Sequence, residues 1–202
     1  MIRNIIFDMG NVLLHFDREA FLDAVDVHGA DRELLLRQVY LSLEWSQMDR
    51  GSLTEAEAAE RMCRRVPPRL WDKVHLLVDQ WDRPILPMAG MEELVRELKE
   101  KGYRIYLLSN ASLRQHEYWP RVPGSEYFDG TVVSADLHLV KPQPEIYLYT
   151  LCRFGLKAEE CVFIDDATLN VEGAVSCGLS GIVYHGDTEE LRTELRSLGV
   201  NA

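Results

Sequence analysis

Acidic side chains and a lysine stand at places in this sequence where chemistry is possible. Asp8 directly follows a short apolar run, Asp165 and Asp166 follow another, and Lys141 lies in a Val-Lys-Pro-Gln-Pro segment. Three carboxylates gathered in one place repel one another, unless a hard divalent cation lies among them. Mg²⁺ prefers oxygen ligands of this kind. These residue types therefore predict a magnesium site beside an aspartate that can act as a nucleophile.

The other polar residues in these positions suit a phosphate group. Ser109 and Asn110 follow an apolar run at 104–108, and a hydroxyl and the ammonium group of Lys141 can donate to phosphate oxygens. Asp8 can form an aspartyl-phosphate, which divides one difficult transfer into two easier steps. The metal and Lys141 would offset the negative charge in the transition state. Each residue also has a structural explanation, because Asp8 and Ser109 can cap a turn or helix and Lys141 can be a solvated loop residue.

A parallel sheet would bring these residues together. Largely unbroken hydrophobicity, rather than alternation, predicts strands that are covered on both faces. Helical spacing fills the segments between the later strands, and a glycine follows each helix as an expected left-handed cap. Alternating strands and helices predict an α/β fold, and the carboxyl ends of its strands form the ligand crevice. The predicted strands are 4–7, 104–108, 131–133, 161–164 and 181–184, and the predicted helices are 91–101, 144–154, 170–177 and 187–198.

A block of helices interrupts this alternation. Residues 17–81 contain no convincing strand, and Thr54-x-x-Glu57 is a capping box that opens one of the helices. An apolar stripe within the block consists of Leu34, Leu35, Val39 and Leu43. We expect residues 17–81 to form a small helical cap domain, inserted into an α/β core made of residues 1–16 and 82–202.

Four segments in this order resemble the four motifs of the haloacid dehalogenase-like hydrolase superfamily. They are Phe7-Asp8-Met9-Gly10-Asn11-Val12, Leu108-Ser109-Asn110, Lys141-Pro142 and Phe163-Ile164-Asp165-Asp166. Each motif is weak alone, but the ordered set is specific and covers nearly the whole chain. The resemblance implies a Rossmann-like three-layer core, dependence on Mg²⁺ and, as in most members, phosphatase activity.

The resemblance also implies roles for individual residues. Asp8 corresponds to the nucleophile and to a metal ligand, and Asp166 to a residue that binds the metal directly. Asp165 corresponds to a residue that binds it mainly through water. Ser109 and Lys141 correspond to the phosphate-binding residues, with Asn110 beside Ser109. Lys141 is then also catalytic, because it stabilises the transferred group.

Gly10 departs from the motif of the phosphatases in this superfamily. These enzymes usually carry an aspartate there, which protonates the leaving oxygen and later activates water. The carbonyl of Gly10 can still bind the metal, but loss of the acid would cost about 10²–10⁴ in rate for a poor leaving group. His15 is one candidate for the missing proton donor. Phe16, Trp45, Gln47, Asp49 and Arg50 also lie where a cap can face the crevice, although core packing is the simpler explanation for the two aromatic residues.

The first motif also suggests a substrate. D-x-G-N-V with a downstream Trp119-Pro120 resembles a subgroup that includes sugar-1-phosphatases acting on glucose 1-phosphate. An anomeric oxygen leaves more easily than an ordinary alkoxide, so such a substrate tolerates the loss of the acid. The predicted function is therefore Mg²⁺-dependent hydrolysis of a small phosphate monoester, such as a hexose 1-phosphate. The alternatives are a phosphate-binding regulatory protein with little catalysis and a metal-independent haloacid dehalogenase, against which the Asp165-Asp166 pair argues.

Composition narrows the possible partners. The 202 residues include 22 basic and 33 acidic ones, which gives a net charge of −11 and disfavours binding to nucleic acids. No segment is long and apolar enough for a signal peptide or a membrane span. The four cysteines are widely spaced, so we expect reduced and mostly buried thiols and a cytoplasmic location. A small phosphorylated metabolite is the expected partner, bound by a monomer or a homodimer.

Overall fold

The computed structural model describes all 202 residues, and its centre is one parallel sheet. The strand order β3-β2-β1-β4-β5 places β1 between β2 and β4. The chain therefore moves to opposite sides of β1 in its two halves, which is the arrangement that opens a crevice at the carboxyl ends of the strands. The predicted α/β fold is confirmed. The strands are β1 (Asn4–Phe7), β2 (Arg104–Ser109), β3 (Gly130–Val133), β4 (Cys161–Asp165) and β5 (Ser180–Val183).

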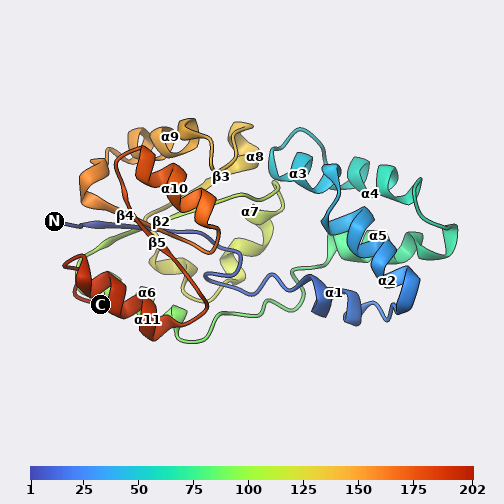
Figure 1. The fold of residues 1–202 in the computed structure, drawn as a ribbon, viewed down its shortest axis with the longest axis horizontal. Helices are drawn as coiled ribbons and strands as arrows, with labels where there is room; N and C mark the ends of the chain where they lie inside the picture. The colour runs from blue at the N-terminus through green and yellow to red at the C-terminus, as the bar shows by residue number, and fades with distance from the viewer.

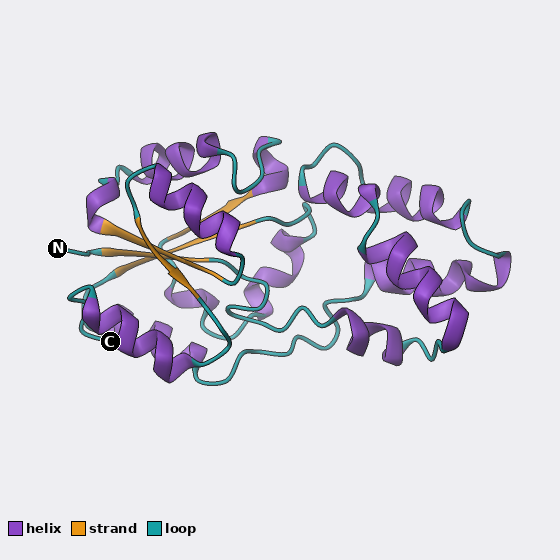
Figure 2. Ribbon diagram, in the orientation of Figure 1, coloured by secondary structure: helices purple, strands orange, loops and turns teal.

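Helices cover both faces of the sheet and make three layers (Figures 1 and 2). On one face, α6 (Met91–Glu100) and α11 (Thr188–Ser197) pack against side chains such as Phe7. On the other face, α9 (Pro144–Phe154) and α10 (Thr168–Ser176) pack against side chains such as Ile6. Successive side chains of a strand point to opposite faces, so each strand needs apolar residues at every position.

The carboxyl ends of α9 and α10 follow the predicted glycine signals. Pro144 stands in the first turn of α9, where its missing N–H is not needed. Gly155 then ends α9 with φ of 61°, and Gly178 follows α10 with φ of 90°. The structure starts α10 at Thr168, two residues before the predicted start, and Asn170 lies within its first turn.

The chain between β1 and α6 forms a separate block of helices, at the far end of the molecule from the two termini (Figure 1). A cluster of 16 buried residues from Leu22 to Val78 packs these helices together. The Thr54 capping box is present with both of its reciprocal hydrogen bonds. The elements are α1 (Arg18–Ala24), α2 (Gly29–Leu35), η1 (Leu36–Tyr40), α3 (Leu43–Asp49), α4 (Glu55–Cys63), η2 (Pro68–Leu70) and α5 (Trp71–Asp79). We call this block the cap.

The predicted apolar stripe in the cap is wrong at one position. Leu35 and Val39 are buried, whereas Leu43 is 70% exposed. The reason is that the helix does not continue: the π-helix η1 ends at Tyr40, and Ser42 caps a new helix, α3, with its side chain. Leu43 therefore starts a helix with a different orientation, and the helical spacing from Leu35 does not extend to it.

Several short elements complete the core. They are α7 (Gln115–Tyr118), η3 (Trp119–Arg121), η4 (Ser125–Tyr127), α8 (Ser134–Leu137) and η5 (Ala158–Glu160). No helix has the length and apolar character that crossing a membrane requires. All four cysteines are free; Cys63 and Cys161 are buried, whereas Cys152 is exposed, contrary to the expectation of mostly buried thiols.

The cap contacts the core at a point beside α8, opposite the two chain segments that connect it to the core (Figure 1). Ser134 donates its hydroxyl to the carbonyl oxygen of Asp49, and His138 Nδ1 lies 3.0 Å from the carbonyl oxygen of Arg50. Gly51 is so close to the core that a Cβ there would lie 2.2 Å from the carbonyl oxygen of Ala135. Only glycine therefore allows this close approach.

Candidate active site

The predicted acidic residues meet at the carboxyl ends of neighbouring strands. Phe7 of β1 and Ile164 of β4 are register partners, so Asp8 and Asp165 follow side by side. Asp8, Asp165 and Asp166 each offer a carboxylate oxygen, and these oxygens all lie within 4.8 Å of one another. Asp8 and Asp165 are buried and Asp166 is exposed. The strand pairing thus brings three carboxylates together, of which Asp166 is the one exposed to solvent.

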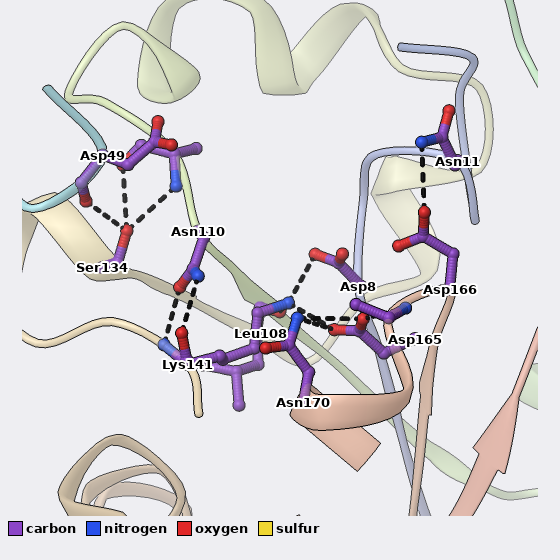
Figure 3. A network of polar contacts seen from close by, with 12 residues as sticks. Asp8, Asn11, Asp49, Leu108, Asn110, Ser134, Lys141, Asp165, Asp166 and Asn170 are labelled. Carbon is purple, nitrogen blue, oxygen red and sulfur yellow. Dashed lines mark hydrogen bonds and ion pairs between the residues drawn. The ribbon is translucent and has the colours of Figure 1, made fainter. Parts of the chain in front are cut away.

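Lys141 lies at the centre of this cluster (Figure 3). Its Nζ is 2.8 Å from Asp8 Oδ1 and 2.7 Å from Asp165 Oδ2, and it donates to the carbonyl oxygen of Leu108 at 3.0 Å. Burial alone would lower the pKa of Lys141, but the two carboxylates outweigh it and raise that pKa. Lys141 therefore stays protonated and holds the Asp8 carboxylate in one orientation.

The Asp8 carboxyl group is poorly stabilised without a further cation. Burial raises the pKa of Asp8 to about 7, Lys141 acts to lower it, and Asp165 raises it further. One lysine thus serves two buried carboxylates, with a third carboxylate beside them. The three aspartates of this cluster offer oxygen atoms, which are the ligands that Mg²⁺ prefers, and a divalent ion would favour the ionised form of Asp8. These residues fit a bound Mg²⁺.

Asp165 differs from the other two acids because protein donors already surround it. Its Oδ1 accepts from the backbone N–H of Ala167 at 2.8 Å and from Asn170 Nδ2 at 3.0 Å, and its Oδ2 accepts from Lys141. Asp8 and Asp166 each keep an oxygen with no hydrogen bond. Protein donors thus occupy both oxygens of Asp165, and Asn170 supports this residue; the contact of Asp165 to a metal through water stays a prediction.

Asn11 is a site residue to which the sequence analysis gave no role. It has φ of 54°, a left-handed conformation that asparagine tolerates better than most residues. Its Nδ2 donates to Asp166 Oδ2 at 3.1 Å, and its Oδ1 accepts from the backbone N–H of Phe16 at 3.0 Å. Asn11 therefore ties the loop after β1, which carries Gly10, to the outermost carboxylate of the site.

Ser109, the last residue of β2, and Asn110, which follows it, lie beside the cluster in different ways. Ser109 is buried and lines the cavity above Asp8, with its hydroxyl available to a ligand. Asn110 also lines this cavity, but its side chain is hydrogen-bonded to the backbone of Lys141. Its Nδ2 donates to the carbonyl oxygen of Lys141 at 3.1 Å, and its Oδ1 accepts from the N–H of Lys141 at 2.8 Å. Its side chain therefore positions Lys141, and its phosphate-binding role stays a prediction.

A cavity of about 320 Å³ lies between the core and the cap, with Asp8 at its floor. Phe16 forms part of its wall, with ring centroids 5.0 Å from Trp81 and 5.7 Å from Trp45. Phe16 and Trp45 thus pack against other aromatic residues, as expected, and also face the cavity. The cap is what encloses the space above the carboxylates.

Two polar groups of the cap end at the cavity without a partner. Tyr40 is 3% exposed, and its hydroxyl makes no hydrogen bond. Glu55 Oε1 is likewise buried and unpaired. An unpaired buried polar atom costs about 1–3 kcal/mol, a cost that a ligand hydroxyl in the cavity would remove. No sequence signal marked these residues, because their placement depends on how the cap helices pack.

Two other expectations concern residues that lie away from this cavity. His15 is exposed and is not among the residues that line it, so the structure does not place His15 to protonate a leaving group. Trp119 packs edge-on against Phe128 at 5.0 Å in the core and is also absent from the cavity wall.

The haloacid dehalogenase-like hydrolase family matches residues 2–178. The chain belongs to this family. This haloacid dehalogenase-like hydrolase is 29% identical over 202 aligned positions to the sesquiterpene phosphatase astK of Aspergillus oryzae, covering 96% of this chain and 94% of that protein. It is 26% identical to the D-ribitol-5-phosphate phosphatase of Bacteroides thetaiotaomicron, covering 85% and 86%.

Solved structures share the fold of this hydrolase along its whole length. A haloacid dehalogenase family enzyme of Bacteroides thetaiotaomicron, solved with magnesium and inorganic phosphate, is 25% identical with a TM-score of 0.70, covering 95% of this chain and 99% of that one. Some relatives are longer: this chain spans 46% of flavin mononucleotide hydrolase 1 of Arabidopsis thaliana and 36% of drimenol cyclase drtB of Aspergillus calidoustus.

Proposed function

We propose that this hydrolase is a Mg²⁺-dependent phosphatase that cleaves a small phosphate monoester through an aspartyl-phosphate at Asp8. The observation that carries the proposal is the Asp8 carboxylate, which Lys141 orients from 2.8 Å at the floor of a cavity that the cap encloses. One oxygen is bound and the other is free to attack phosphorus. The phosphatases among the relatives support the same reaction.

The surrounding residues would bind the phosphate group and the metal ion. Ser109 donates a hydrogen bond to a phosphate oxygen, and Lys141 neutralises charge on the phosphoryl group. Asp8, Asp166 and the carbonyl of Gly10 would hold Mg²⁺, with Asp165 reaching it through water. When bound, the ion neutralises charge on the phosphate oxygens.

The alcohol part of the substrate is a small molecule that carries hydroxyl groups. Tyr40 and Glu55 support this proposal, because their unpaired polar atoms suit ligand hydroxyls, while the aromatic wall suits the apolar face of a sugar ring or a carbon chain. The activity named for the Bacteroides relative, on D-ribitol 5-phosphate, also supports a phosphorylated polyol or sugar. Within this class, a hexose 1-phosphate remains our specific proposal. Its anomeric oxygen leaves more easily than an ordinary alkoxide, so it depends least on the proton donor that Gly10 does not supply.

A panel of phosphate esters tests both the reaction and its substrate class. The panel contains hexose 1-phosphates, hexose 6-phosphates, polyol phosphates and prenyl phosphates, each assayed with Mg²⁺ and with a chelator. We expect Mg²⁺-dependent release of phosphate that is highest for hydroxylated esters. Turnover that is highest for prenyl phosphates would overturn the substrate class, and phosphate binding without turnover of any ester would indicate a regulatory protein.

The variant Asp8→Asn tests the nucleophile. We expect it to lower kcat by at least about 10³-fold while the thermal unfolding temperature stays close to that of the wild type, because asparagine keeps the shape but cannot attack phosphorus. The matched control is Asp72→Asn, which changes an exposed carboxylate on α5, outside the cavity. Activity of Asp8→Asn above the level of a mock purification would remove Asp8 from this role.

A further inference from the structure

The core alone offers no proton donor where the leaving oxygen would lie. Gly10 has no side chain, and Lys141 is engaged with two carboxylates and a carbonyl. Tyr40 and Tyr118 line the cavity, but burial raises the pKa of both phenols and makes them poor acids near pH 7. Apart from the nucleophile Asp8 and the predicted metal ligand Asp166, the acidic residues that line the cavity lie on the cap, and they are Asp49 and Glu55.

Asp49 is fixed in position relative to the loop that follows β2. The hydroxyl of Ser134 donates to the carbonyl oxygen of Asp49 and accepts from the backbone N–H of Ala111 at 2.9 Å. Ala111 directly follows the Ser109-Asn110 pair, and Figure 3 shows Asp49 beside Ser134 at this place. The close approach of Gly51 to Ala135 fixes the next turn of the chain. A cap residue is thus held beside the predicted phosphate-binding residues.

The side chain of Asp49 lies in the cavity without a hydrogen bond or an ion pair, although four charged groups act on it. Burial raises the pKa of Asp49 to about 8, and the carboxylates of Asp8 and Glu55 contribute to the increase. Lys141 and Arg18 act in the opposite direction. The Asp49 carboxyl therefore holds a proton at neutral pH and can give it to a ligand in the cavity.

We propose that Asp49 is the catalytic acid and base of this hydrolase, in place of the side chain that Gly10 lacks. The inference rests on the proposed phosphatase function. As Asp8 Oδ forms a bond to phosphorus, the bond from phosphorus to the leaving oxygen breaks, and its electron pair stays on that oxygen. The oxygen takes the proton of Asp49, so an alcohol leaves and Asp49 becomes a carboxylate.

The second half of the reaction restores both residues. Asp49 accepts a proton from water as the water oxygen bonds to phosphorus, and the bond between phosphorus and Asp8 breaks. Hydrogen phosphate leaves, Asp8 returns to a carboxylate and Asp49 to a carboxylic acid. A single residue of the cap thus serves both steps, and catalysis requires the cap to be in contact with the core.

The test compares two leaving groups in the first turnover. Wild type, Asp49→Asn and the control Asp72→Asn are mixed with Mg²⁺ and either 4-nitrophenyl phosphate or the best alkyl phosphate of the panel. For the alkyl ester, we expect Asp49→Asn to lower the rate of alcohol release by about 10²–10⁴-fold. For 4-nitrophenyl phosphate we expect less than about a tenfold loss, because 4-nitrophenolate leaves without a proton. Asp72→Asn should match the wild type on both esters.

The outcomes separate this inference from the proposed function. Equal losses on the two esters would assign Asp49 to binding or structure and would overturn the inference. Unchanged rates on both esters would also overturn it. Circular dichroism and the affinity of Asp49→Asn for inorganic phosphate check that the variant folds and keeps its site. If the wild type releases alcohol from neither ester, the proposed function fails and the inference falls with it.

Discussion

The charges of the site are arranged around one buried lysine. Lys141 has a side chain with no exposed surface, and it contacts two carboxylates, one of which Asn170 and the N–H of Ala167 also hold. A buried lysine with only one partner would be costly, whereas a network in which every atom is paired can keep charges inside a protein. The arrangement leaves Asp8 as the buried acid with a free oxygen.

Asp49 gives a prediction for stability as a function of pH. An ordinary aspartate loses its proton near pH 3.8 in the unfolded chain, but folding raises the pKa of Asp49 to about 8. Between these values unfolding releases a proton, so raising the pH favours the unfolded state. We expect Asp49→Asn, which cannot ionise, to be more stable than the wild type at pH 7, by up to about 4 kcal/mol, and similarly stable below pH 4.

Chemical denaturation of metal-free protein at pH 4, 7 and 8 measures this difference. Asp72→Asn, which changes an exposed acid of the cap, should follow the wild type at each pH. A difference between Asp49→Asn and the wild type that stays constant from pH 4 to pH 8 would show that Asp49 ionises normally in the folded protein.

At the residue scale, position in the sequence made some site residues predictable. Asp8 and Asp165 follow buried strands, and the carboxyl ends of parallel strands meet at one edge, so their meeting could be expected. Asp49 was expected to lie where the cap can face the crevice, whereas Tyr40 and Glu55 carry no such signal. They reach the cavity only because α3, α4 and η1 pack in a particular way, which no local pattern encodes.

The loop after β1 shows how an element positions chemistry. It contains the nucleophile, the carbonyl of Gly10 and a left-handed residue, and Asn11 links it to Asp166 of the loop after β4. The loop bends within a few residues, which brings the N–H of Phe16 back to the Asn11 side chain. Asn11 thus supports both the backbone shape and the outer carboxylate.

A pair of variants separates these two contributions of Asn11. Both Asn11→Ala and Asn11→Gly lose the hydrogen bonds to Asp166 and Phe16, but only alanine is strained at a φ of 54°. We expect both variants to bind Mg²⁺ more weakly, and Asn11→Ala to be less stable than Asn11→Gly by about 1 kcal/mol. Calorimetric titration and urea denaturation measure the two effects. Wild-type affinity for Mg²⁺ in both variants would contradict the role in holding Asp166.

The strands of the core were more predictable than the helices of the cap. A strand covered on both faces is a continuous apolar run between turn residues, and each predicted strand agrees with the structure to within one residue at either end. In the cap, short helices follow one another with little spacing. The chain changes from η1 to α3 at Ser42, so the helical spacing of Leu35 and Val39 does not extend to Leu43.

The whole molecule consists of a sheet core and a cap that meet above the carboxylates. Two chain segments connect them on one side, and the contact of residues 49–51 with α8 joins them on the other (Figure 1). Residues of both parts line the cavity. Access of a substrate to Asp8 thus depends on the position of the cap.

Gly51 allows a test of this dependence. Gly51→Ala places a Cβ 2.2 Å from the carbonyl oxygen of Ala135, so the cap must move away from the core. The control is Gly29→Ala, which has a similar positive φ, 54° against 71°, but nothing within 4 Å of its Cβ. We expect both to lose about 1 kcal/mol of stability, and only Gly51→Ala to raise KM, by about tenfold. Equal KM values for the two variants would show that the 49–51 contact does not shape the cavity.

Ser134 has one hydroxyl for two tasks, because it joins the cap to the core and also pairs with the backbone of Ala111 beside the predicted phosphate-binding residues. The same oxygen atom thus links Asp49 of the cap to the residue that follows the Ser109-Asn110 pair. A movement of the cap that breaks the Ser134–Asp49 bond would leave the bond from the N–H of Ala111 to Ser134 in place. The loop that carries Ser109 and Asn110 would then keep this attachment to the core while the cap moves.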